Sequence, residues 1–263
     1  MTNFSVEISP GLKTKTADLL NALTKLQPDL VSITCRVKNS SSISDTLALA
    51  NAVQNQCHIS AMPHLPAVYL THEKARAVLN QLTTQKITHV LALRGDLRPD
   101  MIQNDFSSAG ELIKFIKNKQ PEIQISGVCQ LEQLNLPNLR TKIAGGCTSL
   151  ITQIFYDNAA FYRLRSACQQ AGLNAPIIAG IMPITSYQQA QRIQRLGRIS
   201  IPDKLNQILE KYQANPASLK QASLDYTLRQ VSDLIDHQVA GIHVFTMNDL
   251  TAAAAIKRNF NFT

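Results

Sequence analysis

The sequence contains no tryptophan, and its 263 residues include only 8 phenylalanines and 6 tyrosines. A chain of this length can bury a sizeable core, which here must be mostly aliphatic. No run of 18 apolar residues occurs, so we expect no membrane span. The first ten residues lack a basic segment followed by an apolar one, so no secretory signal peptide is predicted.

Motifs for several kinds of chemistry are also missing. The five cysteines are odd in number, widely spaced and never arranged as CxxC, which indicates reduced thiols in a cytoplasmic protein. The six histidines show neither HxH nor HExxH spacing, so no metal site is predicted. The GxSxG motif of serine hydrolases is absent as well.

The chain is basic, with a formal net charge of +8. It has no run of five lysines or arginines, no aromatic RNA-binding box and no zinc finger, so we expect no nucleic-acid partner. The basic residues are scattered along helical segments. Diffuse surface charge explains this pattern, and an anionic substrate or cofactor is the alternative.

Short β-branched apolar runs alternate with segments that have apolar residues at helical spacing, such as Leu19, Leu23 and Leu26. The eight predicted strands cover residues 4–8, 30–35, 58–65, 89–93, 124–129, 149–156, 176–182 and 241–247. This alternation predicts a (βα)8 TIM barrel forming a single domain over residues 1–263. An extra helical insertion is expected between Ile199 and Ala240. An open doubly wound sheet is the alternative, although no GxGxxG follows the first strand.

Polar residues gather where the predicted strands end. In a (βα)8 barrel the chemistry lies at the carboxyl ends of the strands. Glu7 occupies an apolar strand, where a carboxylate is costly unless it is paired or functional. The strand "HVLAL" runs directly into Arg94, Gly95 and Asp96. A structural ion pair is the alternative explanation for Glu7.

Seven segments follow one another in order: "FSVEISP", "VSIT", "MPHL", "HVLALRGDLRP", "LITQIFYD", "AGIMPI" and "FTMN". Together they resemble the 5,10-methylenetetrahydrofolate reductase family from about Phe4 to Asn248. The ALRGD and ITQxFxD pair is the most specific part. The resemblance implies a (βα)8 barrel that reduces 5,10-methylenetetrahydrofolate to 5-methyltetrahydrofolate with hydride from NAD(P)H, via bound FAD, and so feeds methionine synthesis.

The resemblance also implies roles for individual residues. Glu7 would be the general acid that opens the folate ring to an iminium, which requires a carboxyl group still protonated near neutral pH. Asp96 would be catalytic by stabilising that cation. The substrate-binding positions would be Gln153, Gln189 and Asp96. The cofactor-binding positions would be Thr34, His64, Arg94, Gly95, Asp96 and Lys142. Folate and a nicotinamide nucleotide are the implied partners, and a homo-oligomer stays open.

The sequence departs from the family pattern around the cofactor. The segment after strand five is shorter, and Gln130 replaces a flavin-contacting tyrosine. Thr141 replaces an arginine, Cys35 replaces an aromatic residue, and Asp249 replaces a substrate-side arginine. Two alternatives therefore stay open: direct hydride transfer from NAD(P)H to folate without flavin, and a catalytically weakened subunit that binds folate or flavin.

Overall fold

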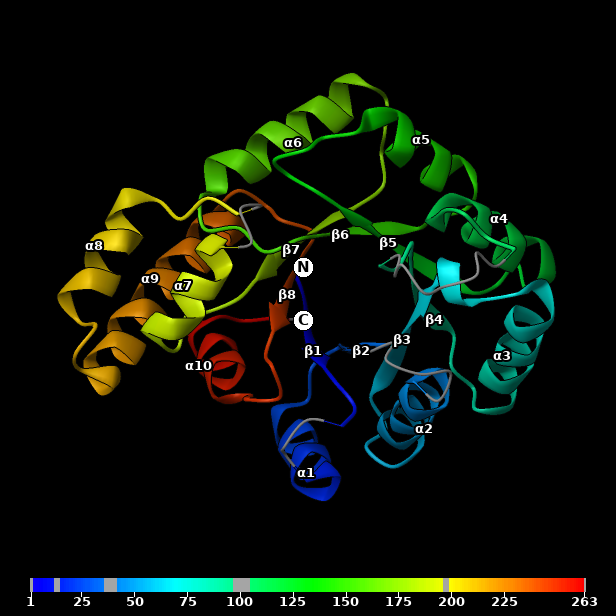
Figure 1. Cartoon of the computed structure of the whole chain (residues 1–263), viewed down its shortest axis with the longest axis horizontal. Helices are drawn as coiled ribbons and strands as arrows, with labels where there is room; N and C mark the ends of the chain where they lie inside the picture. Colours follow the sequence, from blue (N-terminus) through cyan, green and yellow to red (C-terminus); the bar gives the residue numbers. More distant parts are fainter. Residues whose placement is uncertain (1, 12–14, 36–41, 97–104, 196–198, 263) are drawn as a thin grey trace.

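The computed structural model describes residues 2–11, 15–35, 42–96, 105–195 and 199–262. Eight parallel strands pair in sequence order, and the eighth pairs with the first, so the sheet closes into a barrel (Figure 1). The strands are β1 (Asn3–Ile8), β2 (Leu30–Ile33), β3 (Ser60–Pro66), β4 (His89–Leu93), β5 (Gln124–Cys129), β6 (Ser149–Thr152), β7 (Ile177–Ile181) and β8 (Gly241–Phe245). The predicted (βα)8 barrel is confirmed.

Helices surround the barrel (Figure 1). They are α1 (Thr16–Leu26), α2 (Ser42–Asn55), the short 3-10 helix η1 (Ala67–Tyr69), α3 (His72–Thr84), α4 (Ala109–Lys119), α5 (Leu136–Ala144), α6 (Asn158–Gln170), α7 (Tyr187–Arg195), α8 (Asp203–Lys211), α9 (Pro216–Asp236) and α10 (Thr251–Asn259). Three of them, α7 to α9, separate β7 from β8, which confirms the predicted insertion. Within the described part of the chain, no helix is both long and apolar enough to cross a bilayer.

The alternation of side chains along β1 explains how a carboxylate enters the barrel. Successive residues of a strand point to opposite faces. Phe4, Val6 and Ile8 are 0–1% exposed and belong to the large core cluster outside the sheet. Ser5 and Glu7 therefore point the other way, into the barrel. In a closed barrel this interior is a packed core except near its ends.

The barrel interior combines an apolar layer with a polar one. Met62, Leu91 and Ile151 form a small buried cluster of their own. His243 of β8 is 1% exposed, and its Nδ1 lies 2.8 Å from the Oγ of Ser5. Because β1 and β8 pair with Ser5 opposite His243, the register of the barrel itself produces this polar contact.

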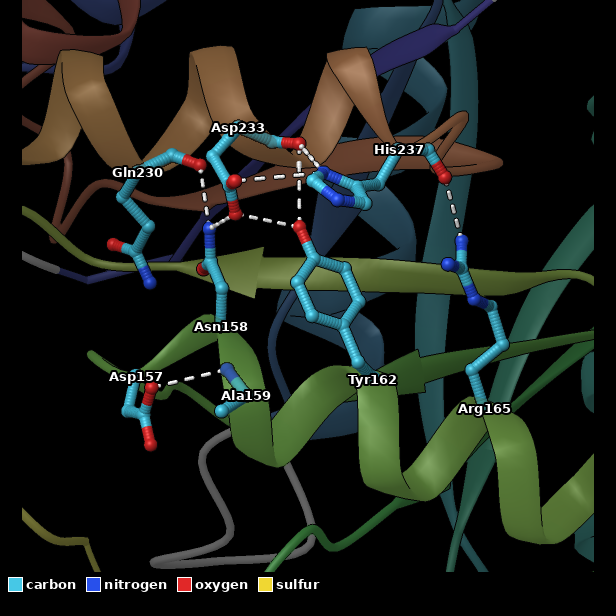
Figure 2. A network of polar contacts seen from close by, with 8 residues as sticks. All are labelled: Asp157, Asn158, Ala159, Tyr162, Arg165, Gln230, Asp233 and His237. Atoms are coloured by element: carbon cyan, nitrogen blue, oxygen red, sulfur yellow. Dashed lines mark hydrogen bonds and ion pairs between the residues drawn. The ribbon is translucent and has the colours of Figure 1, made fainter.

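A polar network joins α6 to α9 on the outside of the barrel (Figure 2). The Oδ2 atom of Asp233 accepts hydrogen bonds from Asn158 Nδ2 at 2.7 Å and from the Tyr162 hydroxyl at 2.6 Å. Arg165 Nη1 donates to the backbone oxygen of His237 at 2.7 Å. The hydrogen bond from Tyr162 is the main cause that lowers the pKa of Asp233. The network ties the long helix before β8 to its neighbour.

Several predicted strands run past the observed ends: the second was expected to reach Cys35 but ends at Ile33, and the seventh was expected to reach Met182 but ends at Ile181. The sixth was expected to reach Tyr156 but ends at Thr152, and the eighth was expected to reach residue 247 but ends at Phe245. After β6 the chain leaves the sheet and reaches Asp157, whose side chain accepts from Ala159 N at the start of α6. Residues 97–99 of the predicted "HVLALRGDLRP" segment lie outside the described residues.

Candidate active site

Glu7 lies at the penultimate position of β1, near the carboxyl end of the barrel. Its Cα is paired with Ser32 on one side and with Phe245 on the other. Its side chain is 18% exposed, so the carboxyl group is mostly withdrawn from water. A carboxyl group at this depth can hold or release a proton toward the open end of the barrel.

His64 of β3 lies near this carboxyl group. Its Nε2 lies 3.9 Å from Glu7 Oε2, and the residue is 7% exposed. Burial, together with the nearby His243, lowers the pKa of His64 to about 3. The imidazole is therefore neutral at pH 7, and the contact is a close approach of a neutral ring to a carboxyl group, not an ion pair.

The turn after β4 carries Arg94, Gly95 and Asp96, and it is anchored on η1. The Val68 amide donates to Arg94 O at 3.0 Å, and the Tyr69 hydroxyl donates to Asp96 O at 2.6 Å. Gly95 has a φ of +85°, and a Cβ there would lie 3.0 Å from Val68 Cγ2. Glycine is thus required for the turn, and the Arg94 and Asp96 side chains remain exposed at the rim.

A second turn, after β8, is hydrogen-bonded to the end of β1. Asn248 Nδ2 donates to Ser9 O at 2.9 Å, and the Ser9 amide donates to Asn248 Oδ1 at 2.8 Å. Thr246 Oγ1 donates to the backbone oxygen of Glu7 at 2.5 Å. Thr34 Oγ1 donates to Ser9 Oγ at 2.6 Å, so the predicted cofactor residue belongs to the same network. These contacts fix the backbone that carries Glu7.

Sequence reasoning assigned no role to Ser9, Thr246 or Asn248 beyond their place at strand ends. One signal was available. An asparagine directly after a strand tolerates a left-handed backbone and can bond nearby main-chain groups. In the structure Asn248 has a φ of 65° and is 7% exposed.

Gln153, just after β6, lines a cavity of about 570 Å³ between the segment after β5 and helix α6. Its wall contains charged groups of both signs, among them Glu132, Asp157 and Arg163. Gln130, for which the resemblance implies the loss of a flavin-contacting tyrosine, lines it as well. The segment after β5 thus borders a cavity with polar and charged walls.

Gln189 of α7 lines a second cavity, of about 330 Å³, at the ends of β7 and β8. Its Oε1 accepts hydrogen bonds from Thr185 N at 2.7 Å and from Thr185 Oγ1 at 3.0 Å, which hold the amide in place. Arg192 and Asp249 line the same space. Ile154 lines both this cavity and the larger one, so the two lie next to each other.

Lys142 is placed differently from the other predicted site residues. The residue is 8% exposed, and its Nζ donates to the backbone oxygen of Val128 at 2.7 Å. Burial lowers the pKa of its ammonium group, although the neighbouring thiols of Cys129 and Cys147 act in the opposite direction. The ammonium group therefore lies against the outside of β5, and the predicted contact of Lys142 with a cofactor stays a prediction.

The structure thus brings Glu7 and His64 together, and it links Thr34 to Ser9, two residues after Glu7. The closed parallel barrel places the turn bearing Asp96 at the same end as Glu7, because β1 and β4 point the same way. The described residues contain no group of three histidine, cysteine or acidic side chains that could hold a metal ion. All five cysteines are free.

These features define a (βα)8 barrel with an acidic group near the open end of its strands. The sequence model of the family described as methylenetetrahydrofolate reductase matches residues 1–261, and the chain belongs to this family. It is 26% identical over 243 residues to the 5,10-methylenetetrahydrofolate reductase of Escherichia coli (strain K12), covering 90% of this chain and 82% of that one.

A second relative is longer than this chain. The methylenetetrahydrofolate reductase (NADH) 1 of Arabidopsis thaliana is 28% identical over 237 residues, which cover 81% of this chain but only 40% of the relative. Among solved structures, a Clostridium thermocellum protein that binds two copies of 5-methyl-5,6,7,8-tetrahydrofolic acid has a TM-score of 0.61 at 16% identity. It covers 97% of this chain and 93% of its own. This last similarity supports the fold alone.

Proposed function

We propose that the chain reduces 5,10-methylenetetrahydrofolate to 5-methyltetrahydrofolate with hydride from NAD(P)H. The observation that supports this proposal is the half-buried Glu7 at the end of β1, in a chain of the methylenetetrahydrofolate reductase family. A mostly buried carboxyl group beside a neutral imidazole is suited to keep a proton at neutral pH. A proton donor is what ring opening of the folate requires.

The positions of the predicted site residues suggest a separate role for each of them. Glu7 donates its proton to the folate ring nitrogen that leaves as the five-membered ring opens, which produces an iminium cation. Asp96, exposed on the turn after β4, supplies a negative charge that stabilises this cation. Gln153 and Gln189, in two adjoining cavities, bind the pterin and its extension. Hydride then adds to the exocyclic carbon and yields the methyl group.

The rim fits a flavin in part. Thr34, His64 and the turn of Arg94, Gly95 and Asp96 would hold FAD, with the exposed guanidinium of Arg94 available for a phosphate. When bound, FAD would accept hydride from NAD(P)H and pass it to the folate. Lys142 stays a predicted cofactor contact, and in the structure its ammonium group donates to Val128 O.

The test uses purified protein and a matched pair of variants. Absorbance between the near-ultraviolet and blue reports bound flavin, and NADH oxidation is followed with methylenetetrahydrofolate or with menadione. Glu7→Gln should lower folate reduction by about 10²-fold or more and spare menadione reduction. The control Glu210→Gln, an exposed position on α8, should leave both rates unchanged. Full folate turnover by Glu7→Gln would refute the assignment.

One observation favours a second candidate, a subunit that binds folate without turning it over. The positions around the cofactor differ from the family pattern, with Gln130 lining an open cavity and Lys142 turned inward. Folate binding measured by calorimetry, in the absence of any turnover with or without added FAD, would select this candidate. Turnover by a colourless, flavin-free protein would select direct hydride transfer.

A further inference from the structure

His64 has an unusual environment for a polar side chain. Its Nε2 is fully enclosed and has no hydrogen-bond partner among the described residues. Buried polar atoms of proteins nearly always have one, so an exception calls for an explanation. The atom lies 3.9 Å from Glu7 Oε2, which is beyond hydrogen-bonding distance but within reach of a small side-chain rotation.

His243, a second buried histidine of the barrel, has hydrogen-bonding groups next to both ring nitrogens. His243 is also buried, and both of its ring nitrogens face hydroxyl groups: Nδ1 lies 2.8 Å from Ser5 Oγ, and Nε2 lies 3.3 Å from Ser32 Oγ. A neutral imidazole has one donor and one acceptor nitrogen, and the two serines can match either tautomer. The interior of the barrel thus satisfies His243 completely and leaves His64 Nε2 open toward Glu7.

We propose that His64 is a positioning residue whose Nε2 accepts a hydrogen bond from the protonated carboxyl group of Glu7. The inference rests on the proposed function, because it explains how the general acid Glu7 is kept protonated. His64 is neutral at physiological pH, so Nε2 can act as an acceptor if Nδ1 carries the hydrogen. A hydrogen bond made only to the neutral carboxyl group favours the protonated state.

The other described groups around Glu7 are neutral or lie on the exposed turn after β4. On β2, its Cα partner Ser32 is uncharged, and so is Thr34 just after this strand. On β8, His243 is neutral because burial lowers its pKa to about 3. Arg94 and Asp96 carry opposite charges on the exposed turn after β4. The His64 variants leave all of these groups in place, so a difference in the Glu7 midpoint between His64→Leu and His64→Gln depends on the atom near the Nε2 position.

The titration can be measured without ligand. The chain has six glutamates and six histidines. Protein labelled with ¹³C at the glutamate side-chain carboxyl groups is titrated by NMR, and Glu7→Gln assigns the Glu7 signal. His64→Leu removes the acceptor and should lower the Glu7 midpoint by about one pH unit. His64→Gln keeps a polar atom near the Nε2 position and should shift the midpoint less.

The outcomes separate the alternatives. An unchanged midpoint in His64→Leu would overturn the proposal. A raised midpoint would overturn it as well, because it would mean that Nε2–H donates to the carboxylate. If His64→Leu fails to fold, ¹⁵N NMR of the wild-type histidines decides: Nε2 must carry no proton. A confirmed shift without any folate turnover would refute the proposed reaction while the pairing of the two residues stands.

Discussion

Asn248 is one of the side chains that join the turn after β8 to β1, and replacing it offers a quantitative test. Asn248 makes two buried hydrogen bonds to the main chain of Ser9, at 2.8 and 2.9 Å. Ser9 is 6% exposed, so neither of its backbone groups can turn to water if the amide is removed. Asn248→Ala should therefore destabilise the protein by much more than a surface substitution.

The magnitude follows from three contributions. Each buried backbone group of Ser9 left without a partner costs about 1–2 kcal/mol. Asn248 has a φ of 65°, a left-handed conformation that costs alanine about 1 kcal/mol more than asparagine or glycine. Asn248→Ala should thus lower the free energy of unfolding by about 3–5 kcal/mol. Asn248→Gly lacks the conformational part and should be about 1 kcal/mol more stable than the alanine variant.

Urea unfolding followed by far-ultraviolet circular dichroism measures these differences. Asn248→Asp keeps an acceptor for the Ser9 amide and should lose about half as much as Asn248→Ala. Asn138→Ala, at an exposed position of α5, is the control and should change stability by less than about 0.5 kcal/mol. A loss below about 1 kcal/mol for Asn248→Ala would refute the reasoning, since the Ser9 groups would then have found other partners.

Three further predictions concern the fold outside this turn. Asp233→Asn should cost about 1 kcal/mol at pH 7, where the wild-type carboxylate accepts from Tyr162. Because the folded-state pKa of Asp233 is lowered, the difference should vanish as the pH falls from about 4 through that pKa, and equal urea midpoints at pH 7 would contradict it. Gly180→Ala should prevent folding of the barrel or lower its free energy of unfolding by more than about 3 kcal/mol, because the added Cβ would lie 2.3 Å from Thr152 O. A cooperative thermal transition at the wild-type temperature would contradict this prediction. A thiol reagent should modify half-exposed Cys35 first and the four buried cysteines only after unfolding. Cys35→Ser should remove the fast phase, and a fast phase that persists in this variant would contradict the prediction.

The barrel was predictable because its sequence signal is repeated. Each strand is a short apolar run and each helix has its own periodicity, so an error in one element does not change the topology. The ends of β6 and β8 were less predictable. Residues 154–156 read as strand because they are apolar or aromatic, yet Phe155 and Tyr156 are buried by packing outside the sheet. Phe155 stacks on Phe161, and Tyr156 joins a cluster with residues of α7 to α9.

The depth of Glu7 could be inferred from alternation along β1, but its partner could not. Which side chain lies opposite depends on the register between strands that are not adjacent in the barrel. His64 is on β3 and Glu7 on β1, so no pairing of neighbouring strands sets their distance directly. Likewise, the burial of His243 depends on β8 closing against β1, a contact between residues more than 200 positions apart.

Lys142 shows that a match of residue type does not determine where a side chain points. On α5, Leu139 and Lys142 are the two buried residues, three positions apart on the same face of the helix. A lysine on the apolar face of a short helix extends its aliphatic stem along the core and needs an acceptor for its ammonium group. Val128 O, on the strand beneath, provides that acceptor. The helical spacing of Leu139 and Lys142 therefore predicts the burial of this charge, whereas its contact with a cofactor stays a prediction.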